Sequence, residues 1–216
     1  MSVIERLGHG GLVPVVEIGD PGLAVPLGDA LVDGGLGCAE ITFRTSAAAA
    51  AIRALRLGRP DVLVGAGTVL TVEQVDAAAD AGAAFIVAPG FSPGVVDRAL
   101  GLGLPVIPGV CTPTEIELAL SHGVDVLKFF PAEAAGGVAF LKAVAAPYRS
   151  VRFVPTGGIG PENVARYLAI PQVLACGGSW MVAKDLVAAG DFATIRRLTA
   201  EAVALVRAAR PASAAI

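Results

Sequence analysis

The sequence has few of the residues that build metal centres, disulfide frameworks or base-stacking surfaces. Only two histidines and three cysteines occur among 216 residues, and aromatic residues make up 5%. Cys38, Cys111 and Cys176 lie far apart within apolar segments, so we expect reduced core thiols rather than disulfides or zinc ligands. So low an aromatic content also disfavours a surface that stacks nucleic-acid bases. We therefore expect no metal, no cofactor site built from these residues and no nucleic-acid partner.

Long apolar runs and concentrations of one charge are also absent. No uncharged apolar run reaches the roughly 18 residues of a membrane span, and the first residues, with Glu5 and Arg6, do not resemble a signal peptide. The net charge is −3, with acidic and basic residues interspersed, which argues against a polybasic membrane patch. We expect a cytoplasmic protein with no membrane partner.

Strand-like runs alternate with alanine-rich helical segments along the chain. The predicted strands are Leu12–Ile18, Cys38–Phe43, Val62–Ala66, Ala84–Ala88, Pro105–Pro108, Val124–Phe129, Val151–Pro155 and Gln172–Cys176. The predicted helices lie near 23–33, 46–57, 71–81, 93–101, 113–121, 137–145, 161–168 and 184–208. This alternation predicts parallel strands, and the eight repeats predict an α/β protein with a closed (β/α)8 TIM barrel.

No linker or change in composition divides the chain, so we expect a single domain over residues 1–216. Residues 1–11 would be an N-terminal extension, and about 209–216 a frayed tail. An open doubly wound sheet is the alternative architecture, but no Gly-x-Gly-x-x-Gly sequence opens the first helix.

Lys128 is unusual for its position. The chain has three lysines against thirteen arginines, and this lysine lies in an apolar predicted strand, directly before Phe129, Phe130 and Pro131. Burial there would disfavour the charged ammonium and favour a neutral amine that attacks carbonyl carbons. The simpler interpretation is a strand-end lysine whose amine reaches water.

Polar and turn residues occur at the C-terminal ends of the predicted strands, where (β/α)8 barrels place their active sites. They are Glu17, Glu40, Arg44, Thr68, Pro89, Pro108, Lys128, Thr156 and Gly177. Because side chains alternate along a strand, Glu40, Thr42 and Arg44 share one face, and we assign that face to the inside. Lys128, Glu40 and Thr68 are then expected to converge. A purely structural ion pair of Glu40 with Arg44 or Lys128 is the alternative.

Two glycine pairs, Gly157-Gly158 and Gly177-Gly178, follow the seventh and eighth predicted strands. Glycine lets backbone N–H groups approach an anion closely. Loops after these two strands, with a short extra helix, often bind phosphate in barrels, and Ser179 could begin such a helix. Two tight turns are the alternative, but the paired occurrence favours a phosphate site.

A lysine in an apolar setting, a carboxylate, an arginine and a phosphate cradle together fit a Schiff-base enzyme acting on a phosphorylated keto compound. The amine condenses with the ketone, the resulting iminium weakens a neighbouring C–C bond, and the carboxylate moves protons. An arginine suits a substrate carboxylate. A phosphosugar epimerase or isomerase on the same barrel, or a non-catalytic binder of phosphorylated ligands, remains as an alternative.

From about residue 12 to 205, the chain resembles bacterial 2-keto-3-deoxy-6-phosphogluconate aldolases, whose family includes enzymes that cleave 4-hydroxy-2-oxoglutarate. The matching stretches are Val13–Val16, Glu40–Thr45, Val64–Leu70, Ala88–Gly90, Ile107–Gly109, Lys128–Glu133, Val154–Ile159 and Gly177–Trp180. The resemblance implies a class I aldolase that cleaves 2-dehydro-3-deoxy-6-phosphogluconate to pyruvate and D-glyceraldehyde 3-phosphate in the Entner–Doudoroff pathway. It also implies a cytoplasmic homotrimer that needs no cofactor.

The resemblance further implies a role for individual residues. Lys128 would form the Schiff base, and Glu40 would be the general acid and base. The implied substrate-binding residues are Arg44 and Thr68 for the pyruvate carboxylate, Pro89 and Phe130 for the pyruvate pocket, and Thr156 for the substrate hydroxyls. The implied phosphate-binding residues are Gly157, Gly158, Gly178 and Ser179.

Glu17 departs from the family pattern. It ends the first predicted strand on the same face as Val13 and Val15, where family members tend to carry an apolar or basic residue. A second carboxylate could change the ionisation of Glu40 or the sugar end of the pocket. A salt bridge at the rim of the pocket is the simpler expectation.

Overall fold

Strands and helices alternate along residues 1–210, the part of the chain that this computed structural model describes. The strands are β1 (Leu12–Val16), β2 (Cys38–Thr42), β3 (Leu63–Gly67), β4 (Ile86–Val87), β5 (Val106–Ile107), β6 (Gly109–Val110), β7 (Val126–Phe129), β8 (Arg152–Pro155) and β9 (Cys176–Gly178). The α-helices are α1 (Val3–Gly10), α2 (Ala24–Asp33), α3 (Ala48–Gly58), α4 (Val72–Asp80), α5 (Pro93–Gly101), α6 (Pro113–Ser121), α7 (Gly137–Ala145), α8 (Val164–Leu168), α9 (Lys184–Ala189) and α10 (Phe192–Ala209). Two 3₁₀-helices are η1 (Pro21–Leu23) and η2 (Trp180–Val182).

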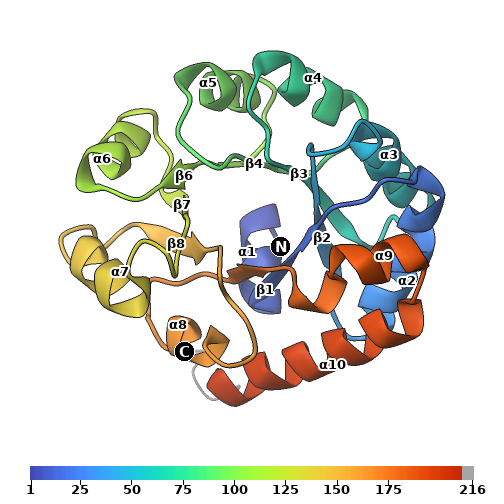
Figure 1. The fold of residues 1–216 in the computed structure, drawn as a ribbon. Coiled ribbons are helices and arrows are strands. Elements are labelled where there is room, and N and C mark those ends of the chain that lie inside the picture. The colour runs from blue at the N-terminus through green and yellow to red at the C-terminus, as the bar shows by residue number, and fades with distance from the viewer. Residues whose placement is uncertain (211–216) are drawn as a thin grey trace.

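The result is an α/β fold in which helices α2 to α10 lie outside the strands (Figure 1). Every strand pair is parallel, as the alternation of strands and helices predicts. Parallel pairing brings the C-terminal ends of the strands to one end of the molecule, so residues that follow different strands meet there. No helix within residues 1–210 is both long and apolar enough to cross a membrane.

Strand pairing forms two sheets rather than one continuous ladder around eight strands. One sheet has the order β5-β4-β3-β2-β1-β9 and the other the order β6-β7-β8. Pro108 separates β5 from β6, and a proline has no N–H to donate to a ladder. Between β8 and the β9 segment, only the isolated bridges Phe153↔Val173 and Thr156↔Gly177 occur. The structure thus confirms the parallel α/β class, whereas the ladder does not close over eight strands.

The cysteines of the strands behave as core residues. Cys38 in β2 is 5% exposed and Cys176 in β9 is fully buried. Burial is the largest influence on both thiols and raises the pKa of each to about 12. A thiol held neutral in this way is a poor nucleophile and a poor metal ligand. All three cysteines are free, but Cys111 is only partly buried and is not the core residue that we expected.

Residues 1–11, predicted to be an extension, contain helix α1. Ser2 and Glu5 cap it with a reciprocal capping box, and Leu7 is fully buried. Its Arg6 donates from Nη2 to the carbonyl oxygen of Asp61, 2.9 Å away and just before β3. Figure 1 shows α1 behind the centre of the ring of strands. The helix therefore covers the N-terminal ends of the strands, opposite the expected site.

Several predicted element boundaries differ from the observed ones, and two of these differences bear on the site. The last strand is not Gln172–Cys176 but β9, in which Gly177 pairs with Val13 and Gly178 with Pro14. A glycine pair is typical of a turn after a strand, yet this pair lies within a strand. The strand has glycine at both positions because neighbouring side chains leave no room for a Cβ. One at Gly177 would lie 2.3 Å from Thr156 Oγ1, and one at Gly178 would lie 2.0 Å from the Trp180 ring.

The predicted helix 184–208 is two helices. Gly190 ends α9 in the left-handed conformation, with φ +66°, and α10 begins two residues later. Glycine is the residue that most readily adopts this conformation, so it stops the helix. The predicted tail of 209–216 starts at the end of α10, and residues 211–216 lie outside the described part of the chain.

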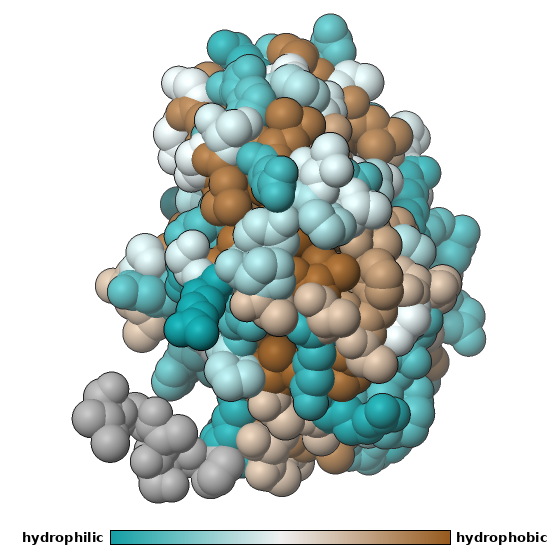
Figure 2. All heavy atoms as spheres, turned by 90° about the vertical axis from the view of Figure 1, so that its left-hand side faces the viewer, coloured by the Kyte–Doolittle hydropathy of each residue, from teal (hydrophilic) through white to brown (hydrophobic). Residues whose placement is uncertain are grey.

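The surface in Figure 2, on the side of α6 and α7, mixes hydrophobic and hydrophilic residues. Leu118 of α6 is 41% exposed. Larger exposed fractions occur elsewhere, at Leu57 (77%) and Leu70 (56%). Singly exposed apolar residues are common on protein surfaces, and neither this face nor these leucines identify a ligand site.

Candidate active site

Lys128 of β7 and Glu40 of β2 meet inside the fold. Lys128 Nζ lies 3.7 Å from Glu40 Oε1, and their side chains are only 5% and 3% exposed. The amine of Lys128 therefore does not extend into bulk water. The predicted convergence of these two residues is present, and it follows from their shared inward face on two strands of the same parallel fold.

The carboxylate of Glu40 is not fully satisfied. Its Oε1 is buried and has no hydrogen-bond partner among the described residues. A buried polar atom without a partner costs about 1–3 kcal/mol, and native proteins retain few such atoms. This oxygen is therefore free to accept a proton or a hydrogen bond from a group next to the Lys128 amine.

Gly67 makes room for Glu40. A Cβ at this position, at the end of β3, would lie 2.1 Å from Glu40 Oε1. Gly65 is constrained in the same way on the same strand, because a Cβ there would lie 2.3 Å from the ring of Phe85. Gly65 and Gly67 thus leave room for the Phe85 ring and for the Glu40 carboxylate.

Phe130 connects the buried pair with an open pocket. The Lys128 amine lies 5.1 Å from the centroid of the Phe130 ring, a distance typical of cation–π contact. The same ring lines the pocket. A cis peptide bond joins Phe130 to Pro131.

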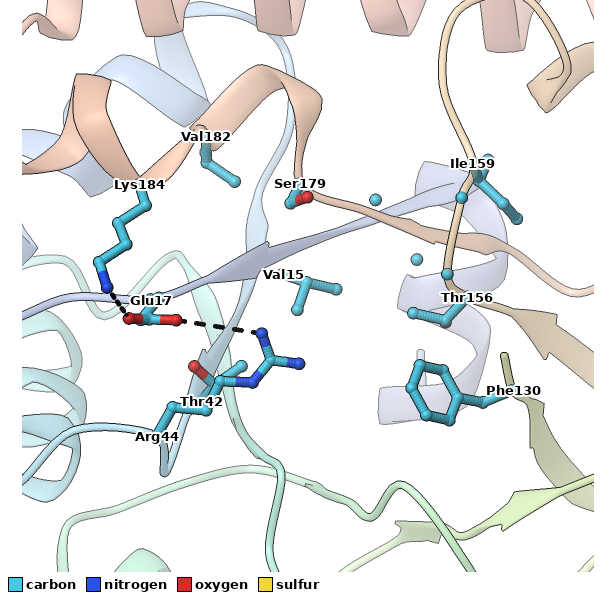
Figure 3. A pocket seen from close by; sticks show the side chains of 14 residues that line it. Val15, Glu17, Thr42, Arg44, Phe130, Thr156, Ile159, Ser179, Val182 and Lys184 are labelled. Carbon is cyan, nitrogen blue, oxygen red and sulfur yellow. Dashed lines mark ion pairs between the residues drawn. The ribbon is translucent and has the colours of Figure 1, made fainter. Parts of the chain in front are cut away.

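The pocket has a volume of about 210 Å³ and lies at the C-terminal ends of the strands (Figure 3). Seven of the residues to which the family resemblance assigns a role line it. They are Arg44, Phe130, Thr156, Gly157, Gly158, Gly178 and Ser179. The other lining residues are Val15, Glu17, Thr42, Ile159, Gly177, Val182 and Lys184. The side chains of Arg44 and Thr156 point toward the shared space from opposite sides.

Thr68 and Pro89 are not among the lining residues. They follow β3 and β4 at the same end of the molecule, where Val69 N–H donates to the carbonyl oxygen of Val87. Thr68 has φ +55° and is the only non-glycine residue with a positive φ among residues 1–210. A β-branched residue rarely adopts this conformation, which costs about 1–3 kcal/mol. Such strain at a strand end supports a functional position for Thr68.

Asn163 holds the loop that contains the first glycine pair. Gly157 and Gly158 have φ values of +102° and +76°, which glycine adopts without the steric penalty of other residues. The Asn163 side chain donates from Nδ2 to the carbonyl oxygen of Gly158 and accepts from Gly160 N–H, both at 2.9 Å. Asn163 is 8% exposed. The sequence analysis missed it, although an asparagine just after a Gly-Pro turn is a signal for such a loop contact.

The segment after Lys128 also holds this loop, through two backbone hydrogen bonds. Ala132 N–H donates to the carbonyl oxygen of Thr156, and Glu133 N–H donates to that of Gly157. The fully buried Tyr167 of α8 donates from Oη to Glu133. Burial first, and this bond second, raise the pKa of Tyr167. The Lys-Phe-Phe-Pro-Ala-Glu sequence therefore carries Lys128 and also fixes the neighbouring loop.

Glu17 forms ion pairs at the rim, as the simpler expectation states. Its Oε1 lies 2.6 Å from Lys184 Nζ, and its Oε2 lies 4.0 Å from Arg44 Nη1. Both Lys184 and Thr42 were missed as pocket residues. Thr42 could have been found from its shared face with Glu40, but no pattern in the sequence points to Lys184.

Comparison with known proteins identifies the family of this chain. The family model described as KDPG and KHG aldolase matches residues 3–198. The chain belongs to this family. A 2-dehydro-3-deoxy-phosphogluconate aldolase of Treponema pallidum is 53% identical over 206 residues, which cover 95% of this chain and 98% of the relative.

Two solved structures have the same fold. The KDPG aldolase from Legionella pneumophila, with pyruvate captured at low pH as a covalent carbinolamine intermediate, has a TM-score of 0.89 and 36% identity, and the match covers 93% of this chain and 97% of that one. The 2-keto-3-deoxy-6-phosphogluconate aldolase of Zymomonas mobilis ZM4, with 3-phosphoglycerate, has a TM-score of 0.86 and 41% identity, and the match covers 95% and 96%.

No cluster of three or more His, Cys, Asp or Glu side chains suited to a metal occurs within residues 1–210. The described site offers an amine, a carboxylate, a guanidinium and backbone N–H groups. An amine and a carboxylate at 3.7 Å suit carbonyl condensation with proton transfer.

Proposed function

We propose that this protein is a class I aldolase that cleaves 2-dehydro-3-deoxy-6-phosphogluconate to pyruvate and D-glyceraldehyde 3-phosphate. The observation that carries the proposal is the buried Lys128–Glu40 pair, in which the amine and an unpartnered carboxylate oxygen lie 3.7 Å apart. Family membership and the covalent pyruvate in the Legionella pneumophila relative support it. Cleavage of 4-hydroxy-2-oxoglutarate, which uses the same bond-breaking step, is part of the proposal.

The proposed reaction begins when the neutral Lys128 amine attacks the ketone carbon, C2, and forms a carbinolamine. Glu40 protonates the departing hydroxyl, so that water leaves and an iminium remains. Glu40, now a carboxylate, takes the proton of the C4 hydroxyl, the C3–C4 bond breaks, and its electrons move into the iminium to give an enamine. The aldehyde leaves, Glu40 delivers a proton to C3, and water hydrolyses the pyruvate imine to restore the amine.

The proposed substrate extends from Lys128 through the pocket of Figure 3. Arg44 and Thr68 hold the pyruvate carboxylate, and Pro89 and Phe130 enclose the pyruvate carbons. Thr156 meets the substrate hydroxyls. The backbone around Gly157, Gly158, Gly178 and Ser179 binds the phosphate, and all four of these residues line the pocket. Thr68 and Pro89 follow β3 and β4 at the same end of the molecule, outside the lining of this pocket.

The proposal includes a finer architecture than strand pairing alone gives. We infer a closed (β/α)8 barrel in a single domain, in which β5 and β6 are one strand interrupted at Pro108 and the bridge Thr156↔Gly177 joins β8 to β9. We also infer that the protein acts as a cytoplasmic homotrimer in the Entner–Doudoroff pathway. Light scattering on the pure protein tests the trimer, and a mass other than three times the 21.6 kDa chain would contradict it.

Trapping with borohydride tests the function directly. Reduction of the protein with borohydride in the presence of pyruvate is expected to fix the three-carbon unit on Lys128, where peptide mass spectrometry locates it. Lys128→Met abolishes the adduct and lowers cleavage by more than about a thousandfold, because the covalent route is lost. Lys142→Met, at an exposed lysine of α7, is the matched control and should retain the pyruvate adduct and the cleavage activity. An adduct on Lys142 or Lys184, or none at all, overturns the assignment.

A further inference from the structure

Lys184 is a cation of the pocket that the reaction described above does not use. It is the first residue of α9, reached from Ser179 through the single turn η2, and both residues line the same pocket. Its side chain is 74% exposed, yet its position is fixed by an ion pair 2.6 Å long with Glu17.

The location of Lys184 indicates which part of a ligand it meets. In Figure 3, Lys184 and Glu17 lie on the side of the pocket opposite Phe130, and Phe130 is the lining residue that contacts Lys128. A substrate joined to Lys128 enters the pocket beside Phe130. Its far end therefore extends toward the side that carries Ser179, Val182 and Lys184.

The charges that line the pocket as a whole favour an anionic ligand, and Lys184 is the cation on its far side (Figure 3). Its ionisable lining residues are one acid, Glu17, and two bases, Arg44 and Lys184, so the wall carries a net positive charge. An ammonium group has three N–H donors and no acceptor. One donor suffices for Glu17, which leaves two for a phosphate or carboxylate oxygen.

We propose that Lys184 is a specificity-determining residue that binds the terminal anionic group of the substrate, and that Glu17 positions its ammonium on the pocket wall. This inference rests on the proposed aldolase function. It adds a side-chain cation to the backbone groups proposed for the phosphate. It also accounts for Glu17, the carboxylate that the family resemblance leaves unexplained.

The first experiment compares steady-state cleavage of the phosphorylated substrate with that of its counterpart without the phosphate. Lys184→Met is expected to raise KM for the phosphorylated substrate about fivefold, as for loss of one partly exposed charged contact, with kcat unchanged. For the unphosphorylated counterpart, both constants remain at the wild-type value. Lys184→Arg should keep most of the preference for the phosphorylated over the unphosphorylated substrate, and Lys142→Met should keep all of it. An unchanged preference in Lys184→Met overturns the proposal.

The second experiment isolates the part played by Glu17. Glu17→Gln is introduced into the wild type and into Lys184→Met, and KM for the phosphorylated substrate is measured in each. If Glu17 acts through Lys184, the Glu17→Gln substitution changes KM in the wild type and not in Lys184→Met, and kcat stays constant in both. Equal changes in the two backgrounds overturn the positioning role.

The borohydride trap keeps this inference separate from the proposed function. Lys184→Met is expected to trap pyruvate on Lys128 as the wild type does, since pyruvate lacks the far end of the substrate. A wild type that traps no pyruvate overturns the aldolase function itself. A wild type that traps pyruvate, together with a Lys184→Met variant that keeps its full phosphate preference, overturns the role of Lys184 alone.

Discussion

Two lysine–glutamate pairs lie within this site, and the fold holds them in opposite ways. Lys128 and Glu40 are at most 5% exposed, and their closest charged atoms lie 3.7 Å apart. Lys184 and Glu17 are 74% and 24% exposed, and theirs lie 2.6 Å apart. The buried pair therefore has the looser geometry, and the exposed pair the tighter one.

Under the proposed roles, this difference separates the pair that carries out the chemistry from the pair that recognises the ligand. Burial of two charges costs several kcal/mol unless hydrogen bonds satisfy them, and Glu40 Oε1 has none. A pair kept under such conditions is suited to exchange protons with a third group. An exposed pair contributes only about 0–1 kcal/mol to stability, so the rim pair can be remade around a ligand with little loss to the fold.

The largest effect should come from removing the base function of the buried pair. Glu40→Gln keeps the shape of the side chain but cannot accept a proton, so exchange of the pyruvate methyl protons in heavy water should slow by about 10²–10⁴-fold. Proton NMR measures this exchange. Lys128 should still form its borohydride adduct in the variant, and exchange at the wild-type rate would exclude Glu40 as the base.

A displacement of the same carboxylate should have a smaller effect. Gly67→Ala places a Cβ where Glu40 Oε1 now lies, and a shift of about 1 Å at a catalytic group lowers activity by up to about 10²-fold. Cleavage assays check the loss, and circular dichroism checks that the variant is folded. Gly101→Ala is the matched control, because a Cβ at Gly101 would meet nothing within 4 Å. Full activity in Gly67→Ala would show that Glu40 does not need this space.

Loosening the glycine loop should affect binding more than chemistry. Asn163→Ala removes the two hydrogen bonds to Gly158 and Gly160, so KM for the phosphorylated substrate should rise about fivefold to tenfold while kcat stays near its normal value. Asn163→Asp keeps the acceptor for Gly160 N–H and loses the donor to Gly158. Its KM should therefore lie between those of the wild type and Asn163→Ala. A fall in kcat with constant KM would contradict a role in holding the loop.

The smallest effect concerns stability at the rim. Glu17→Gln removes the ion pair with Lys184, and the free energy of unfolding should fall by less than about 1 kcal/mol. Urea denaturation followed by circular dichroism measures it. A loss of several kcal/mol would mean that the rim pair is part of the structural core, and the contrast with the buried pair would disappear.

Much of this arrangement follows from alternation and periodicity. Parallel α/β structure could be predicted because strand-like and helical segments repeat, and the meeting of Lys128 with Glu40 followed from strand parity. These properties depend on a regular backbone, which sequence patterns describe well. The N-terminal helix α1 was not distinguished from an extension, because one short amphipathic segment before the first strand carries little periodic signal.

Features that depend on side-chain packing were not predictable. The glycines of β9 look like a turn in the sequence, and only the positions of Thr156 and Trp180 show why a strand needs them. Lys184 begins α9, which Gly190 separates from α10, whereas one long predicted helix gave no reason to single Lys184 out. The constrained backbone of Thr68 likewise appears only in three dimensions.

Helix α1 has a practical consequence for work with this protein. Arg6 binds beside the start of β3, and Arg210, beyond α10, donates to the carbonyl oxygens of Leu168, Val173 and Leu174 before β9. Both contacts are at the N-terminal ends of the strands, whereas the pocket is at the opposite end. The chain can therefore be immobilised on a support, or fused to a second enzyme, through the residue that precedes α1 while the entrance for substrate faces away from the attachment.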